Sequence, residues 1–238
     1  MISRVSDEER RSIMGLTEQL KDVLYDCGAD LVGIGDISKV ENSDFNVGIA
    51  VAVSLPKRVI IDLRIAPTKE YYDLYYSLNS KLNDIVTAGE NYLLSLGYEA
   101  YAQTTDRVKI NQDRATAIPH KTVATRAGLG WIGKNCLLVT SQYGPAVRIS
   151  SLLTNAPLEC NKAIDDSRCG ECRVCVEHCP ARALKGTLWN TGVQREDIVN
   201  VEECYKKQNE IMYEHTGIEK DLCGKCFAMC VYVQKHCT

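Results

Sequence analysis

Cysteines carry the clearest chemical signal in this sequence. Residues 169–180 read CGECRVCVEHCP, which spaces four cysteines as C-x2-C-x2-C-x3-C and places a proline after the last. Iron–sulfur clusters need soft thiolate ligands, and this spacing lets successive thiolates converge on one [4Fe–4S] cube. A pair of zinc sites or a disulfide framework is the alternative, but zinc needs only four thiolates per ion and rarely uses this spacing. The run therefore predicts an iron–sulfur protein.

A second group of cysteines follows downstream. In proteins with two clusters the fourth cysteine of such a run binds the other cluster, so further thiolates are required. They occur at Cys204 and in CGKCFAMC, residues 223–230, although 18 residues separate Cys204 from Cys223, and Val231 replaces the usual proline. We predict that one [4Fe–4S] cluster is held by a first set, Cys169, Cys172, Cys175 and Cys230. We predict that the other is held by a second set, Cys179, Cys204, Cys223 and Cys226.

The composition is that of an ordinary globular protein. The chain has 238 residues, of which 45% are apolar and 25% charged, enough for a core and one or two domains. Its N-terminus lacks the apolar stretch of a signal peptide, and no window approaches a membrane span, which predicts a cytoplasmic protein. In that reducing compartment 12 cysteines indicate metal rather than disulfides. Outside the two sets, Cys27 and Cys136 are predicted to be small core residues, whereas Cys160 and Cys237 receive no role.

Positive charge is concentrated in residues 101–150. The net charge of −3 argues against general nucleic-acid affinity. This segment nevertheless carries only Asp106 and Asp113 against Arg107, Lys109, Arg114, Lys121, Arg126, Lys134 and Arg148. The excess is either a solvated basic face or a pocket for an anionic ligand.

Hydrophobic periodicity predicts the elements that must position these residues. It indicates a helix from a capping box at residues 6–9 to Gly28, a long helix over 67–96 and a helix over 119–127. Strands are expected at 31–35, 47–55 and 98–103, with a hairpin formed by 135–140 and 146–154. The continuous apolar run at 47–55 predicts a central strand that is buried on both faces.

The composition changes after Pro157, where most of the cysteines and several short segments occur. A capping box at Asn200 and Glu203 predicts a helix that carries Cys204. We therefore expect an α+β protein in which residues 1–157 form an α/β cofactor domain. Residues 158–238 would form a small ferredoxin-like domain that holds both clusters and depends on its metal.

A glycine-rich stretch, RAGLGWIGKN at residues 126–135, is the second unusual feature. Its three glycines allow the backbone to approach a ligand closely, beside cations and Trp131. The alternative is a turn between a helix and a strand that binds nothing. The spacing of a Walker phosphate loop is absent.

This stretch, followed by Tyr143-Gly144 and the two cysteine sets, closely resembles the epoxyqueuosine reductase family. These are cobalamin-dependent iron–sulfur reductases of tRNA modification, related to reductive dehalogenases, and the resemblance is specific over about residues 119–230. It implies a base-off cobalamin in a nitroreductase-like α/β domain, with two [4Fe–4S] clusters that feed electrons to the cobalt. It also implies that the cofactor contacts Arg126, Gly128, Gly130, Trp131, Gly133, Lys134, Asn135 and Gly144.

The sequence departs from the family pattern in three places. Residues 115–121 stand where the family has an acidic Val-Asp-Thr-x-Pro motif, Cys230 lacks its proline, and the chain ends at Thr238 where the tRNA-modifying enzyme continues. We therefore expect a short homologue with the same scaffold and a different substrate. His120, Asp113 and Tyr143 are the candidate catalytic proton donors in place of the missing acid.

The predicted function is that of an iron–sulfur reductase, an enzyme that passes electrons through both clusters to cobalamin or substrate. The expected partners are a low-potential electron donor such as ferredoxin or flavodoxin, and a small-molecule or modified-nucleoside substrate. Nucleic acid and membrane are not expected as partners. Two alternatives stay open, a ferredoxin-type electron carrier or reductive activator without its own substrate, and the tRNA epoxyqueuosine reductase itself.

Overall fold

An antiparallel sheet forms the centre of the protein, whose computed structural model describes residues 15–233. Strands β1 (Leu31–Asp36), β2 (Val47–Ser54), β6 (Val147–Thr154) and β3 (Ala100–Ala102) lie in the order β1-β2-β6-β3. β2 pairs with β6 along its whole length, from Val47 opposite Thr154 to Ser54 opposite Val147. Its six inner residues are all buried, which confirms the predicted central strand.

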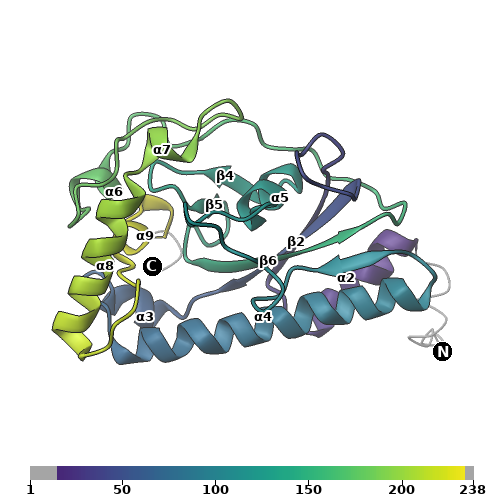
Figure 1. The fold of residues 1–238 in the computed structure, drawn as a ribbon, viewed down its shortest axis with the longest axis horizontal. Helices are drawn as coiled ribbons and strands as arrows, with labels where there is room; N and C mark the ends of the chain where they lie inside the picture. Colours follow the sequence, from purple (N-terminus) through teal and green to yellow (C-terminus); the bar gives the residue numbers. More distant parts are fainter. Residues whose placement is uncertain (1–14, 234–238) are drawn as a thin grey trace, which may run out of the picture.

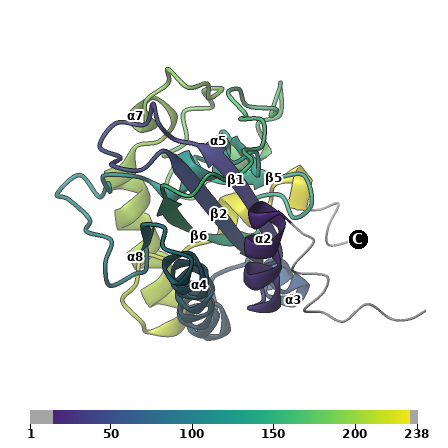
Figure 2. The same ribbon diagram turned by 90° about the vertical axis from the view of Figure 1, so that its right-hand side faces the viewer.

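Helices cover both faces of this sheet. α2 (Leu16–Asp26) and α4 (Lys69–Ser95) lie side by side on one face, and α5 (His120–Arg126) covers the other (Figures 1 and 2). α4 begins after Thr68, whose hydroxyl accepts a hydrogen bond from the Tyr71 amide at 3.1 Å. A short α3 (Lys57–Asp62) follows β2. The long helix and the 119–127 helix are thus confirmed, while the capping box at residues 6–9 lies outside the described residues.

The predicted hairpin between residues 135–140 and 146–154 is wrong. β5 (Leu138–Thr140) pairs instead with β4 (Gly130–Ile132) in a separate small sheet, and β6 pairs with β2 and β3. Gly144, with φ of 57°, turns the chain away after a single bridge from Thr140. β6 then finds a partner for all eight of its residues on β2, which a three-residue neighbour could not offer.

Short elements carry the cysteines after residue 158. They are α6 (Val174–Glu177), α7 (Arg195–Ile198), the longer α8 (Val201–Thr216) and α9 (Lys225–Ala228). Asn200 caps α8 through its side-chain oxygen, which accepts a hydrogen bond from the Glu203 amide at 3.2 Å, as the capping box predicted. α6 packs against α9, so the two cysteine motifs meet.

Two apolar cores hold the protein together, and both cross the predicted domain boundary at 157/158. The core under α2 and α4 also contains Met212, Leu222 and Phe227. The core under α5 also contains Leu184 and Ile198. The expected mixed α/β architecture is present, whereas the division into two domains stays a prediction. Because the cores are shared, the sheet fixes the position of the cysteine-rich part.

Within residues 15–233, no helix combines the length and the apolar character that crossing a membrane requires.

Candidate iron–sulfur site

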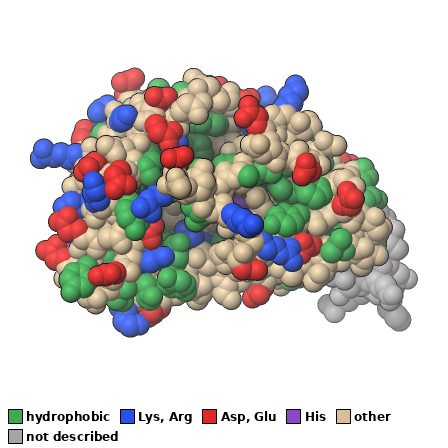
Figure 3. All heavy atoms as spheres, in the orientation of Figure 1, with side chains coloured by type: hydrophobic (Ala, Val, Ile, Leu, Met, Phe, Trp, Pro, Cys, Tyr) green, Lys and Arg blue, Asp and Glu red, His purple; other side chains and the backbone are tan. Residues whose placement is uncertain are grey.

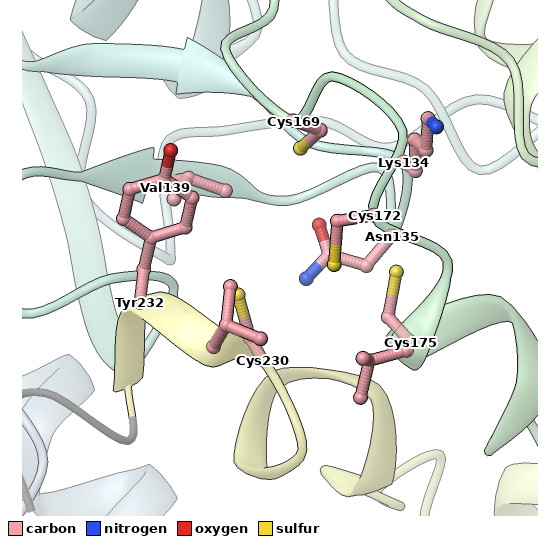
Figure 4. A pocket seen from close by; sticks show the side chains of 10 residues that line it. Lys134, Asn135, Val139, Cys169, Cys172, Cys175, Cys230 and Tyr232 are labelled. Carbon is pink, nitrogen blue, oxygen red and sulfur yellow. The ribbon is translucent and has the colours of Figure 1, made fainter.

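The four thiols of the first set surround one cavity. Its wall also includes Lys134, Asn135, Val139 and Tyr232, and Figure 4 shows the sulfur atoms of the four cysteines facing its interior. Burial, together with the nearby Cys230, Cys169 and Cys172, raises the pKa of the Cys175 thiol to about 12. Four thiols that line one cavity in this way need a bound positive group to become thiolates together.

The spacing of these thiols fits a cluster better than a single ion. Zinc holds its four thiolates at about 2.3 Å, so they lie within about 4 Å of one another. No group of three or more His, Cys, Asp or Glu side chains in the described part of the chain is arranged to hold one ion. The sulfur atoms instead border a volume, which suits a cube that takes one thiolate on each iron. The residues present therefore fit a [4Fe–4S] cluster.

The second set is assembled from three parts of the chain. Cys179 follows α6, Cys204 lies on α8, and Cys223 and Cys226 lie at the start of α9. Burial raises the pKa of the Cys223 thiol, and its neighbours Cys204 and Cys179 add to the increase. The structure thus brings Cys179 to the second set although it belongs to the first run. The assignment of the eight cysteines to two cluster sites stays a prediction, with which these neighbours agree.

One lysine ties each set to the sheet-bearing part of the protein. Lys134, which is only 5% exposed, donates from Nζ to the carbonyl oxygen of Gly170 at 2.6 Å, in the loop between Cys169 and Cys172. Lys225, between Cys223 and Cys226, donates to the carbonyl oxygen of Arg64, shortly after α3. Both cysteine loops are therefore anchored to a folded scaffold.

The glycine-rich stretch packs closely against the protein itself. A β-carbon at Gly130 would overlap the carbonyl oxygen of Val139 on the paired strand, and one at Gly128 would lie 2.7 Å from the carbonyl oxygen of Lys162. A β-carbon at Gly144 would lie 2.8 Å from the Val233 amide nitrogen, and one at Gly133 would lie 2.6 Å from Asn135 Oδ1. These contacts account for the glycines by packing, and their contact with a cofactor stays a prediction.

The other predicted cofactor residues divide between two places. Arg126 forms an ion pair with Asp165 and donates to the carbonyl oxygen of Ile164 at 3.0 Å. Trp131 is 1% exposed and meets Tyr232 edge to face, with 5.0 Å between ring centroids. Lys134 and Asn135 line the first-set cavity. The stretch thus forms part of the wall of the candidate cluster site.

Most of the cations of residues 101–150 have partners within the protein. Figure 3 shows positive and negative side chains interspersed over the visible face. Most of these cations engage protein groups: Arg107 with Glu90, Arg114 with the ring of Tyr205, Lys121 with the Cys136 carbonyl and Arg148 with Asn79. An anion pocket built from this segment stays a prediction.

The three candidate proton donors lie on separate segments. His120 begins α5, with Nδ1 2.8 Å from Ser151 Oγ, and burial, assisted by the charge of Arg148, lowers its pKa to about 4. Asp113 is exposed in the loop before α5, and its backbone carbonyl accepts a hydrogen bond from Arg195 at 2.7 Å. Tyr143 lies in the turn after β5. His120 is held in a partly buried polar network with Ser151.

The cysteines outside the two sets differ in exposure. Cys136 is buried, as predicted, but Cys27 is exposed, so its predicted core position is wrong. Cys27 follows the last turn of α2, where the chain leaves the helix face that packs on the core. Cys160 is exposed, and Cys237 lies outside the described residues.

The sequence reasoning missed Gln208. Its side-chain amide donates to the sulfur of Cys204 at 2.9 Å, one turn earlier on α8. The spacing of four residues on a predicted helix was the signal that could have found this contact.

Comparison with known proteins identifies the fold and a 4Fe–4S segment. Residues 162–185 match a sequence family described as a 4Fe–4S binding domain. A reductive dehalogenase whose structure is described in terms of B12-dependent dehalogenation gives a TM-score of 0.67 at 18% identity, over 96% of this chain and 32% of that one. An epoxyqueuosine reductase solved with a tRNA-Tyr stem loop gives 0.59 at 19% identity, over 92% of this chain and 65% of that one. These likenesses show the fold, a mixed α/β protein with a ferredoxin-like 4Fe–4S segment.

Sequence similarity is more specific. Over 114 residues the chain is 34% identical to the epoxyqueuosine reductase of Lactococcus garvieae, which covers 48% of this chain and 29% of the relative. The resemblance to the epoxyqueuosine reductase family is thus confirmed, over less than a third of that relative's length. The expectation that nucleic acid is not a partner finds no support, because one of the similar structures contains a tRNA stem loop.

Proposed function

We propose that this protein is an iron–sulfur reductase that passes electrons through two [4Fe–4S] clusters to a cobalamin or a substrate, held by a nitroreductase-like domain. The observation that supports it best is the gathering of eight thiols into two adjacent groups beside the sheet. The groups adjoin because α6 packs on α9, and Cys175 of the first set is among the neighbours that raise the pKa of Cys226, after burial. Two clusters so placed would be neighbours, as this proposal requires.

The second set faces the interior of the sheet-bearing part. Tyr71 on α4 is buried against Phe227, with ring centroids 6.1 Å apart. Burial raises the pKa of Tyr71, the charge of Arg148 opposes this increase and Cys226 adds to it, so Tyr71 lies near both Arg148 and the second set. The charge of Arg148 also helps to lower the pKa of His120, so these two side chains lie near each other. The second set is therefore the exit for electrons in this proposal, and the first set is the entry.

The polar side chains near Arg148, His120 among them, are the proposed site of substrate reduction. His120 is neutral above about pH 4, and Ser151 Oγ, 2.8 Å from its Nδ1, also accepts a hydrogen bond from Gln103 at 2.5 Å. A neutral imidazole held in this way can keep a proton on its other ring nitrogen for a bound substrate. A cobalamin bound here would supply the reductive chemistry, while these residues would orient the reactants and exclude water. A low-potential ferredoxin or flavodoxin and a modified nucleoside or small molecule are the partners in this proposal.

Metal analysis and a cofactor titration test the proposal. Anaerobically prepared protein should contain about eight irons and eight sulfides per chain. Added cobalamin should then bind in its base-off form, with a change in its absorption spectrum. Zinc at about two ions per chain without sulfide would contradict the cluster assignment.

The cofactor titration needs variants that leave the clusters intact. Changes at Gly130 or Lys134 would disturb β4 or the first-set cavity directly, so they cannot separate cofactor binding from folding. Arg148→Gln should weaken cobalamin binding at unchanged iron content, and Lys81→Gln, beside Gly28, is the matched control. Iron-replete wild type that binds no cobalamin would favour the electron carrier.

A further inference from the structure

The side-chain amide of Gln208 is directed at a sulfur of the second set. Its Nε2 lies 2.9 Å from Cys204 Sγ, a short separation for an N–H group and a sulfur. Gln208 and Cys204 are four residues apart on α8, so the rigid helix fixes the two side chains on one face. α8 itself is held by its Asn200 cap and by the buried Met212. The donor is therefore in place before any cluster binds.

Asn135 occupies a comparable position at the first set. It is 5% exposed, and its Oδ1 accepts a hydrogen bond from the Leu137 amide at 3.2 Å, which fixes the orientation of the side chain. Its amide nitrogen is thereby turned away from the backbone, and Figure 4 shows it pointing into the cavity that the four cysteines line. No hydrogen bond from this nitrogen to protein is seen in the described part of the chain. A buried amide donor is thus aimed at the place where a cluster would sit.

Hydrogen bonds to sulfur stabilise the form of a cluster that carries more negative charge. Reduction adds one electron, which is spread over the iron, the sulfide and the thiolate sulfur atoms. An N–H donor near those sulfur atoms therefore favours the reduced form and raises the reduction potential. Residues that contact metal ligands in this way tune a site without binding the metal.

We propose that Gln208 and Asn135 each donate a hydrogen bond to the sulfur of one cluster and so set the two reduction potentials separately. This inference rests on the proposed function, because it requires both clusters to be bound. Gln208 acts on the second cluster from α8, and Asn135 acts on the first from the turn between β4 and β5. The two donors share no element, so either potential can change without the other.

Redox titration of the iron-replete protein tests this proposal. The electron paramagnetic resonance signals of the reduced clusters report the two reduction potentials. Gln208→Met keeps the length of the side chain and its helix propensity but removes the donor. It should shift the electron-transfer equilibrium of the second cluster about tenfold toward the oxidised form, or about 59 mV to lower potential for one electron. Asn209→Met is the matched control, because Asn209 donates a bond of the same length, 2.9 Å, to the carbonyl oxygen of Tyr205 rather than to sulfur.

Asn135→Asp tests the other half. It keeps the oxygen that accepts from Leu137 and replaces the donor with a carboxylate, so the potential of the first cluster alone should fall. The proposal is overturned if iron-replete Gln208→Met keeps both wild-type potentials, or if Asn209→Met shifts them equally. Wild type that binds no iron would overturn the proposed function as well, whereas wild type with two clusters and unresponsive potentials overturns this inference alone.

Discussion

The first and second cysteine sets differ in how the chain builds them. Three cysteines of the first set come from one run, Cys169 to Cys175, and the wall around them comes from the turn between β4 and β5. The second set combines the end of that run with α8 and α9, and it faces α4. A regular motif thus specifies most of one site, whereas the other exists only because α6 and α9 pack together. Local spacing can encode the first kind of site, but the second requires the tertiary fold.

Exchange of Cys179 and Cys175 for serine tests this contrast with the largest expected effect. Each variant should lose one whole cluster, about half of the iron. Cys179→Ser should remove the signal of the second cluster and Cys175→Ser that of the first, although both cysteines lie in the same run. Iron analysis and paramagnetic resonance would show this, with the exposed Cys160→Ser as a control that should change neither. Removal of the same signal by both variants would show that the sets are paired differently.

The aromatic anchors beside the two sets should differ in energy. Phe227 follows Cys226, is 7% exposed and packs against Tyr71. Phe227→Ala should lower the free energy of unfolding by about 3–5 kcal/mol, because it leaves a cavity between α9 and α4. Tyr232, the counterpart at the first set, is only partly buried against Trp131, so Tyr232→Ala should cost less.

Thermal unfolding and the rate at which a chelator removes iron would measure both anchors. The second-set iron should leave first in Phe227→Ala. Equal destabilisation by the two variants would mean that the sets are anchored alike.

The smallest of the expected effects is a loss of stability in acid, caused by protonation of His120 in the sheet-bearing part of the protein. Its pKa is about 4 in the folded protein against about 6.5 in an unfolded chain, so between these values the unfolded state binds more protons. The stabilisation is complete above about pH 6.5 and is lost as the pH falls toward 4, by at most about 3 kcal/mol at 1.36 kcal/mol per pKa unit.

His120→Gln should flatten this part of the pH profile of stability. Because the second set faces Arg148 and His120, the variant should also alter acid-induced iron loss more at that set than at the first. An unchanged profile would show that His120 titrates normally.

The sequence was sufficient for elements that a single local signal defines. The apolar run of β2, the long α4 and the Asn200 cap of α8 all lie within two or three residues of their predicted positions. The hairpin prediction was wrong because β6 pairs with β2, a strand of matching length about a hundred residues earlier in the chain. No local sequence pattern indicates such a long-range pairing. For the glycine-rich stretch, the sequence alone leaves open whether a glycine admits a ligand or, as at Gly130, allows close packing on another strand. Gln208 was missed because an amide becomes informative only when its neighbour is known to be a ligand.

The return of Cys230 to the first set makes correct assembly a matter of timing during synthesis. Cys169, Cys172, Cys175 and Cys179 leave the ribosome together, and for about 1–5 s, at 5–20 residues per second, they are the cysteines of both sets that exist, until Cys204 is added. An iron–sulfur carrier that delivered a cluster in this interval would find four thiols with the spacing for one cube. That cluster would then bind Cys179 together with Cys169, Cys172 and Cys175, in place of Cys230. Only after residues 204–230 emerge can α9 meet α6 and draw Cys179 away. If both predicted clusters form, late delivery of iron would favour the predicted pairing, and early delivery would give a chain with one misplaced cluster.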